Sequence, residues 1–265
     1  MIIDGKKIAE EILAEIAEEV KKSAKSLKLA AVLVGDDADS RRFLELKQKV
    51  AERVGVGFKL YEFPAEITTQ KLRKEIVGIA KAGVNDGVII ELPLPKHINT
   101  QYILNAIPEE KDPDVLSQKS QGAFFVGKSA ILPPAVEAVK IILGKNNIDI
   151  KGKNCSVFGY GILVGKPVSH WLAQEGATVS IINEFTPNPE RYALTADIIV
   201  SGVGKPNLIK DDMIKAGAVV IDFAKDVDFE NITHKASLIT PPTGGVGPIV
   251  TVSVLKNLLK LLKND

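Results

Sequence analysis

Glycines follow an apolar run in the middle of the chain at a spacing that suits phosphate binding: Gly159, Gly161 and Gly165. Cys155 to Phe158 is a short apolar run typical of a buried strand, and a helical pattern opens after the last glycine. Such a turn lets backbone N–H groups and a helix N-terminus approach a pyrophosphate. The spacing G-x-G-x-x-x-G is one residue longer than the commonest dinucleotide fingerprint, so a tight turn without a ligand is the alternative.

A lysine interrupts an apolar stripe in the predicted helix 40–54. Phe43, Lys47, Val50 and Val54 fall on one face at helical spacing. In one interpretation the side chain of Lys47 extends along the apolar face and keeps its charge in water at the rim of the core. In the other, Lys47 is held at a functional site, where desolvation tunes its pKa.

Two carboxylates also stand where chemistry is expected. Glu91 begins E-L-P-L-P at the end of a predicted buried strand, 87–92, and Asp114 ends the charged loop E-E-K-D-P-D. Ligands of parallel sheets bind at the carboxyl ends of strands, so Glu91 is a candidate for proton transfer or binding. The alternative for both residues is a solvated surface position.

Strands alternate with helices along the whole chain. Helices are predicted near residues 8–20, 40–54, 69–82, 133–142 and 250–262, and strands at 29–34, 57–63, 87–92, 155–158, 177–182, 197–201, 218–222 and 237–240. This order predicts an α/β fold with parallel sheets. Glu184 ends the strand 177–182, about where an acidic residue meets an adenosine ribose in NAD-binding folds. The segment T-P-P-T-G-G-V-G-P, 240–248, predicts a shaped loop.

Composition excludes several classes of protein. The formal net charge is +1, so nothing indicates binding to nucleic acid or to an anionic membrane. The only cysteine, Cys155, excludes an internal disulfide, and the three histidines are too scattered to indicate a histidine metal site. There is no signal-peptide pattern and no apolar run of membrane-spanning length, so we expect a soluble, cytoplasmic protein.

Several motifs together resemble the bifunctional methylenetetrahydrofolate dehydrogenase/cyclohydrolase family, nearly end to end. The most specific is T-P-P-T-G-G-V-G-P, close to the family's T-P-V-P-G-G-V-G-P. Others are I-I-D-G-K at the N-terminus, E-L-P-L-P against Q-L-P-L-P, K-D-P-D against K-D-V-D, V-G-K-P at 164–167 and A-D-I-I-V-S-G-V-G-K-P at 196–206.

The resemblance implies two βαβ domains with a cleft between them. Residues 1–136 would form the folate-binding catalytic domain, with the helix 249–265 packed back on it, and 137–248 a Rossmann-type NAD(P)-binding domain. A hydride would pass from the methylene carbon of the folate to the nicotinamide, and water would then open the methenyl ring to give a formyl product. The resemblance also suggests a homodimer formed through the nucleotide domains.

The resemblance also implies a set of site residues. The family pattern S-x-x-Y-x-x-x-K matches Ser40, Phe43 and Lys47, so the resemblance implies that Lys47 is the catalytic lysine. Asp114 matches the folate-contacting aspartate, and Glu91 stands beside the lysine. The expected set is catalytic Lys47, Glu91 and Asp114; substrate-binding Phe43, Leu92, Pro93, Gly244 and Gly245; and cofactor-binding Gly159, Tyr160, Gly161, Gly165, Glu184 and Lys225.

The chain departs from the family pattern at this same site. Phe43 replaces a tyrosine, Glu91 a glutamine and Val115 the glycine after K-D-V-D, while I-L-P-P at 131–134 replaces P-C-T-P. An acid close to Lys47 would hold it as ammonium, so we expect a dehydrogenase with weak cyclohydrolase activity. Tyr160 replaces a common arginine and Glu184 would repel a ribose phosphate, which favours NAD over NADP.

Two alternatives remain from the sequence. A paralogue could act on another pterin or one-carbon carrier, or the chain could be a catalytically inactive folate- or nucleotide-binding protein. Retained Lys47 and Asp114 speak against inactivity, whereas the altered Phe43, Glu91 and Val115 speak for it.

Overall fold

The computed structural model describes residues 1–23 and 25–263, which divide into two compact units. One unit comprises Met1–Glu10 and Ala135–Val250, and the other comprises Glu11–Pro134 and 251–265. The sequence expectation placed residues 1–10 with the first domain, whereas here Ile3 N–H donates to Ile239 O (2.9 Å) and the segment groups with residues 135–250. The pairing of Ile2 with Ile239 as an isolated parallel bridge explains this grouping.

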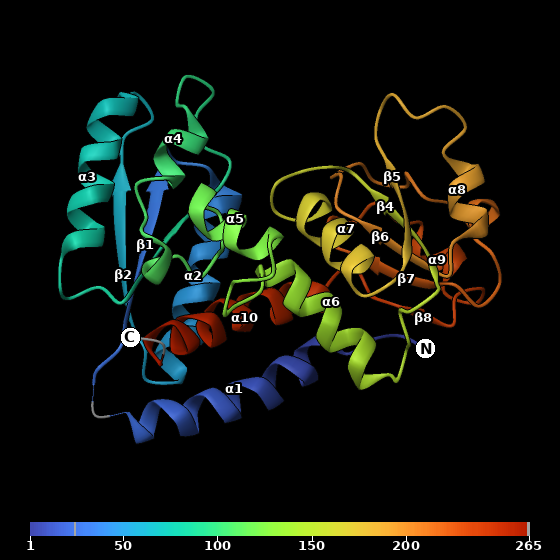
Figure 1. Cartoon of the computed structure of the whole chain (residues 1–265), viewed down its shortest axis with the longest axis horizontal. Coiled ribbons are helices and arrows are strands. Elements are labelled where there is room, and N and C mark those ends of the chain that lie inside the picture. Colours follow the sequence, from blue (N-terminus) through green and yellow to red (C-terminus); the bar gives the residue numbers. More distant parts are fainter. Residues whose placement is uncertain (24, 264–265) are drawn as a thin grey trace. The chain divides into compact units, whose positions relative to one another are not determined.

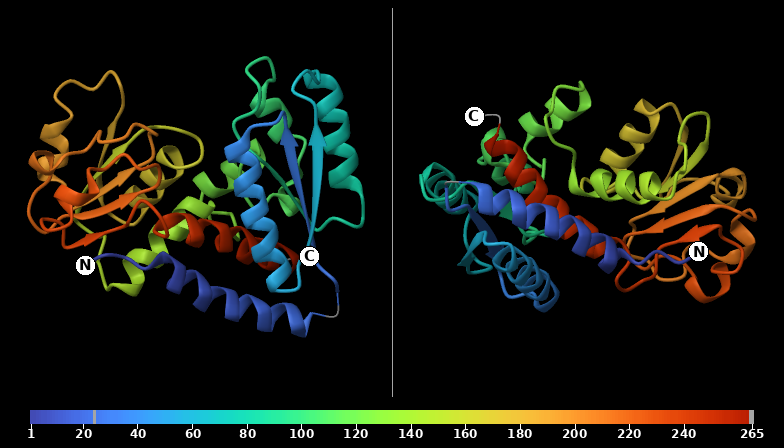
Figure 2. Two further views of the ribbon diagram at one scale, coloured as in Figure 1. Left: turned by 180° about the vertical axis from the view of Figure 1, so that it is seen from behind. Right: turned by 90° about the horizontal axis from the view of Figure 1, so that it is seen from below.

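Residues Glu11–Pro134 and 251–265 are built on a three-stranded parallel sheet with the order β2-β1-β3. Because β1 is central, the chain crosses first to one side and then to the other, and Figures 1 and 2 show α2 and α3 flanking the strands from opposite sides. The bounds are α1 Gly5–Lys22, β1 Lys28–Val34, α2 Ala38–Arg53, β2 Gly57–Phe63, α3 Thr69–Lys81, β3 Gly87–Ile90, α4 Thr100–Leu104, η1 Glu109–Lys111 and α5 Gln118–Phe125.

The other unit contains a five-stranded parallel sheet with the order β5-β4-β6-β7-β8. Its core is a cluster of buried aliphatic side chains with one aromatic, including Phe158, Ile199 and Val220. The bounds are α6 Pro134–Lys145, β4 Asn154–Phe158, α7 Gly165–Gln174, β5 Thr178–Ile182, α8 Glu190–Thr195, β6 Ile198–Ser201, η2 Asp211–Met213, β7 Val219–Asp222, α9 Phe229–Ile232 and β8 Leu238–Ile239. The last helix, α10 Val246–Leu262, begins in this unit, and its residues from Thr251 on belong to the other unit. Figure 1 shows these strands from yellow to red.

Helix starts follow from local capping chemistry. Asp37 caps α2 by accepting from Ser40 N (2.8 Å), and Thr68 caps α3 by accepting from Lys71 N (3.3 Å). A side-chain oxygen at this position satisfies a backbone N–H that the helix itself leaves without a partner. Among the described residues no helix is long and apolar enough to cross a membrane.

Candidate active site

The first sheet places Glu91 at a point where ligands bind. β1 lies between β2 and β3, so the connections diverge at the carboxyl ends of β1 and β3. Glu91 directly follows β3, and its N–H donates to Val32 O (2.9 Å), which fixes it at this edge. Such switch points are the usual binding positions of open parallel sheets.

Lys47 and Glu91 form a partly buried ion pair at this edge. The Lys47 Nζ donates to Glu91 Oε2 at 2.7 Å, and their side chains are only 21% and 10% exposed. An ion-paired hydrogen bond of this length is charge-assisted, and partial burial limits screening by water. The structure therefore holds the lysine against a carboxylate, where the family pattern has a neutral amide.

The buried face of α2 differs from the sequence expectation. Its buried residues are Ser40, Leu44 and Ala51, whereas Phe43 is 56% exposed. The predicted apolar stripe through Phe43 and Lys47 is therefore wrong as a core face, because the small and aliphatic residues one position along fill the contact with the sheet. Lys47 lies at the margin of that contact, half-buried, which lets its Nζ reach Glu91.

Asp114 is the third charged member of this cluster. Burial raises the pKa of Asp114 to about 7, Lys47 opposes the shift, and the carboxylates of Asp112 and Glu91 add to it. Burial also raises the pKa of Asp112, against hydrogen bonds from Ser117 and Leu116. At neutral pH Asp114 can therefore exist in both protonation states, as a donor and as an acceptor.

The loop after β3 holds the two further candidates for substrate binding. The Leu92–Pro93 peptide bond is cis; Leu92 is half-buried and Pro93 is exposed. Both therefore lie at the same sheet edge as Glu91, while their contact with a substrate stays a prediction.

The glycine turn after β4 is built as a cradle. Gly159 has φ +92°, a conformation that favours glycine, and a Cβ on Gly165 would lie 2.1 Å from Gly159 O. A Cβ on Gly161 would meet nothing within 4 Å, so the space beside this residue is open. The residues thus fit a pyrophosphate: two glycines close the turn onto the start of α7, and the middle one leaves room.

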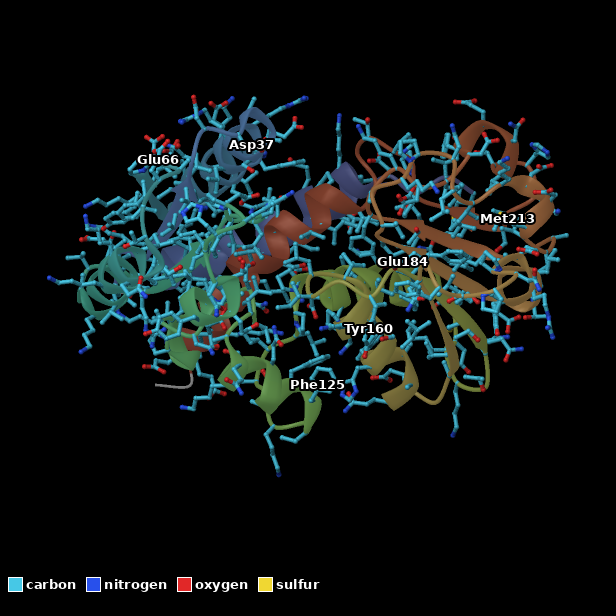
Figure 3. The ribbon with its side chains drawn as sticks, turned by 90° about the horizontal axis from the view of Figure 1, so that it is seen from above. Asp37, Glu66, Phe125, Tyr160, Glu184 and Met213 are labelled. Atoms are coloured by element: carbon cyan, nitrogen blue, oxygen red, sulfur yellow. The ribbon has the colours of Figure 1, made fainter. Side chains whose placement is uncertain are left out.

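The cradle adjoins the switch point of the second sheet. Gly159 N–H donates to Ile182 O (2.8 Å), so the turn is hydrogen-bonded to the end of β5. The turn also lies close to the end of β6, because a Cβ on Gly159 would be 3.2 Å from Gly202 O. Tyr160 and Glu184, both exposed, are labelled in Figure 3 on these neighbouring segments. Lys225, whose side chain is exposed, has φ +63° in the loop after β7.

Sequence reasoning missed two polar residues around the cradle. Asp226 is fully buried and accepts hydrogen bonds from Ser201 Oγ (2.6 Å), Val203 N (2.7 Å) and Lys205 N (2.6 Å), so it shapes the loop after β6. Lys166 lies with its Nζ 5.5 Å from the centre of the Tyr160 ring. The V-G-K-P motif named Lys166 without giving it a role, and nothing local marked Asp226.

Gly244 and Gly245 belong to the unit of residues 135–250, where backbone conformation at the first and packing at the second require glycine. Gly244 has φ +75°, and a Cβ on Gly245 would lie 2.3 Å from Pro241 O. A Cβ on Gly5 would likewise lie 1.7 Å from Gly245 O. Their contact with a folate stays a prediction.

Comparisons with known proteins cover the whole chain. The profile "Tetrahydrofolate dehydrogenase/cyclohydrolase, catalytic domain" matches residues 3–114, and the profile of the NAD(P)-binding domain of the same family matches residues 133–265. The chain is 39% identical to the bifunctional protein FolD of Hydrogenobaculum sp., over 99% of this chain and 98% of that protein. The chain belongs to the tetrahydrofolate dehydrogenase/cyclohydrolase family.

Solved structures of the family share the fold. The bifunctional FolD enzyme of Campylobacter jejuni is 33% identical with a TM-score of 0.95, covering 100% of this chain and 99% of that one. The Trypanosoma brucei FolD, solved with NADP and an inhibitor, is 32% identical with a TM-score of 0.94, covering 100% and 97%. The expectation of an α/β member of this family with parallel sheets is therefore confirmed.

Proposed function

We propose that this protein oxidises methylenetetrahydrofolate to methenyltetrahydrofolate with NAD or NADP as acceptor, and hydrolyses the methenyl product slowly to a formyltetrahydrofolate. Family membership supports the reaction class. The observation that carries the proposal is the Lys47–Glu91 pair at 2.7 Å, with Asp114 in its field, at the carboxyl edge of the first sheet. The family resemblance assigns these same residues to chemistry.

The bound nicotinamide supplies the hydride acceptor for the oxidation. The protein's part is to bind and align: Gly159, Gly161 and Gly165 would hold the pyrophosphate, and Asp114 would hydrogen-bond the pterin ring. Alignment of two bound reactants is itself a large source of rate. Loss of hydride leaves the one-carbon unit positively charged, and the carboxylates of Glu91 and Asp114 would favour that charge.

Hydrolysis needs a group that accepts a proton from water as the water adds to the methenyl carbon. A lysine can do this only after it has lost its own proton. In this structure Lys47 Nζ instead donates a hydrogen bond to Glu91 Oε2 at 2.7 Å, and this bond competes with any contact to water. Phe43 has no hydroxyl that could hold or relay through water. Hydride transfer depends more on alignment, so we propose that oxidation outpaces hydrolysis.

The test is a spectrophotometric assay of both steps. Purified protein should reduce NAD with methylenetetrahydrofolate, and should hydrolyse methenyltetrahydrofolate more slowly than it forms it. Protein that binds both ligands without turnover would establish an inactive binding protein instead. Oxidation only with a different pterin would establish a paralogue with another one-carbon carrier.

Variants of the pair test the slow step. Glu91→Gln should raise the hydrolysis rate, since the lysine then faces a neutral amide, and adding Phe43→Tyr should raise it further. Lys47→Met should remove hydrolysis. Brisk hydrolysis by the unmodified protein, slowed by Glu91→Gln, would contradict this reasoning and make Glu91 a catalytic acid–base group.

We propose in addition that two copies of the chain associate through β5. This strand pairs only with β4 among the described strands, so one backbone edge has no sheet neighbour. Ile181 is 40% exposed and Phe185, just beyond the strand, is 82% exposed. A sheet edge flanked by exposed apolar side chains favours pairing with another chain. Sedimentation should give a dimer, and Ile181→Lys with Phe185→Glu a monomer; an unmodified monomer would refute the interface.

A further inference from the structure

An asparagine lies fully buried on the largely apolar buried face of helix α10. Asn257 is 0% exposed, and its Nδ2 donates to Pro113 O (2.8 Å) and to Leu132 O (2.8 Å). Its Oδ1 has no partner among the described residues, so these two donated bonds are what the amide contributes. A buried amide is retained at such a position only where its hydrogen bonds offset the loss of water.

One of these bonds ends on the residue before Asp114. The segment from Asp112 to Ser117, here called the Asp114 loop, is also stabilised by hydrogen bonds within itself, on the C-terminal side of Asp114. Asp112 Oδ2 accepts from Ser117 N (2.7 Å) and Leu116 N (3.0 Å), and Val115 N donates to Asp112 O (3.1 Å). The backbone is thus fixed both before and after Asp114.

The loop needs such support because its geometry is unfavourable for its sequence. Val115 has φ +57°, a left-handed conformation that β-branched residues rarely adopt, and it is buried. Such a conformation persists only when the surrounding contacts determine it. Asn257 provides a contact from a distant helix, 144 residues away in sequence from Pro113.

We propose that Asn257 is a positioning residue for Asp114. By holding the carbonyls of Pro113 and Leu132, it fixes the backbone immediately before Asp114 and thereby the place of that carboxyl group relative to Lys47 and Glu91. The groups that face Asp114 are Lys47 from α2, Glu91 after β3 and Asp112 from its own loop. Loosening the loop changes the surroundings of Asp114 without removing any of these charges.

The first test needs no substrate. The titration of the Asp114 carboxyl is followed by carbon NMR in the full chain, with its resonance assigned by its loss in Asp114→Asn. In Asn257→Leu the apparent pKa of Asp114 should fall by about one unit toward its ordinary value, because a loosened loop admits water. Asn257→Ser, which keeps one donor and creates less strain, should give a smaller shift in the same direction and serves if the leucine variant does not fold.

The matched control is another buried asparagine of the same unit. Asn85 is 2% exposed, and its Nδ2 donates to the backbone carbonyl of Ile79 (3.0 Å). Asn85→Leu should lower the melting temperature while leaving the titration of Asp114 unchanged. An unchanged titration in both Asn257 variants, or an equal shift in Asn85→Leu, would overturn the proposal.

The second test rests on the proposed function. Asn257→Leu should raise the KM for methylenetetrahydrofolate by about tenfold, the effect of losing roughly one well-placed hydrogen bond, with the KM for NAD(P) unchanged. An equal rise in both constants would overturn the positioning role. Unmodified protein without any turnover would instead overturn the proposed function, and the NMR test would still decide the role of Asn257.

Discussion

Replacing Asp114 by asparagine should stabilise this protein at alkaline pH. Burial raises the pKa of Asp114 to about 7 in the folded chain, from 3.8 as its ordinary value. A carboxyl whose pKa is raised by folding contributes stability that is fully present below pH 3.8 and is lost as the pH rises through 7. Asparagine resembles the protonated form in shape and polarity but does not ionise.

The size of the effect follows from that pKa. Between pH 5 and about 7 the unfolded carboxyl is already ionised while the folded one is protonated, so wild-type stability from this group falls by ~1.4 kcal/mol per pH unit. The free energy of unfolding of Asp114→Asn, relative to that of wild type, should therefore rise by up to ~3 kcal/mol between pH 5 and pH 8. Partial contact with water reduces this value, because Asp114 is half-buried.

The assay is chemical denaturation followed by far-UV circular dichroism at pH 5 and pH 8, for wild type and variant. Asp39→Asn is the control, because it removes the same charge from an exposed position in the same unit. The difference in free energy of unfolding between Asp39→Asn and wild type should be nearly the same at both pH values. If Asp114→Asn gained no more stability at pH 8 than at pH 5, Asp114 would be ionised at little cost, and the argument from its burial would be refuted.

Three further predictions concern the nucleotide. Gly161→Val should lower the affinity for NAD(P) by at least about tenfold while the protein stays folded, because the side chain enters open space where the pyrophosphate would lie; unchanged affinity by calorimetry would rule out the cradle. Gly165→Ala should lower the melting temperature, because its Cβ would lie 2.1 Å from Gly159 O, and an unaltered melting curve would show that the turn can move. The unmodified protein should prefer NAD, and Glu184→Gln should narrow that preference in kcat/KM, because the repulsion of a ribose phosphate is removed. A clear preference of the unmodified protein for NADP would show that Glu184 points elsewhere.

The regular elements were predictable because their signals are local. The strand Gly57–Phe63 was predicted with the same ends as observed, since a glycine precedes its apolar residues and Pro64 follows. Helix α10 begins at Val246 rather than at the predicted residue 250, because Gly247 and Pro248 indicated a loop. Proline is tolerated in the first turn of a helix, where its missing N–H leaves no bond unmade.

The candidate site was only partly predictable. Motifs identified Lys47, Glu91 and Asp114, because a family resemblance carries residue identities. The supporting residues were not found, since their partners are distant in sequence: Asn257 reaches Pro113, and Asp226 reaches back to the loop after β6. The segment between residues 93 and 132 lacks periodicity, so its short helices α4 and α5 were missed.

The left-handed backbone of Val115 bears on how this site can diverge. Val115 holds a glycine-type conformation at a position where the family pattern has glycine. The strain costs ~1–3 kcal/mol, and burying the valine side chain returns ~1.5–3 kcal/mol, so the two residues are nearly equivalent in free energy at this position. Glycine and valine codons differ by a single base. One neutral mutational step therefore separates this chain from the family pattern here, and the change of residue is not by itself a sign of lost function.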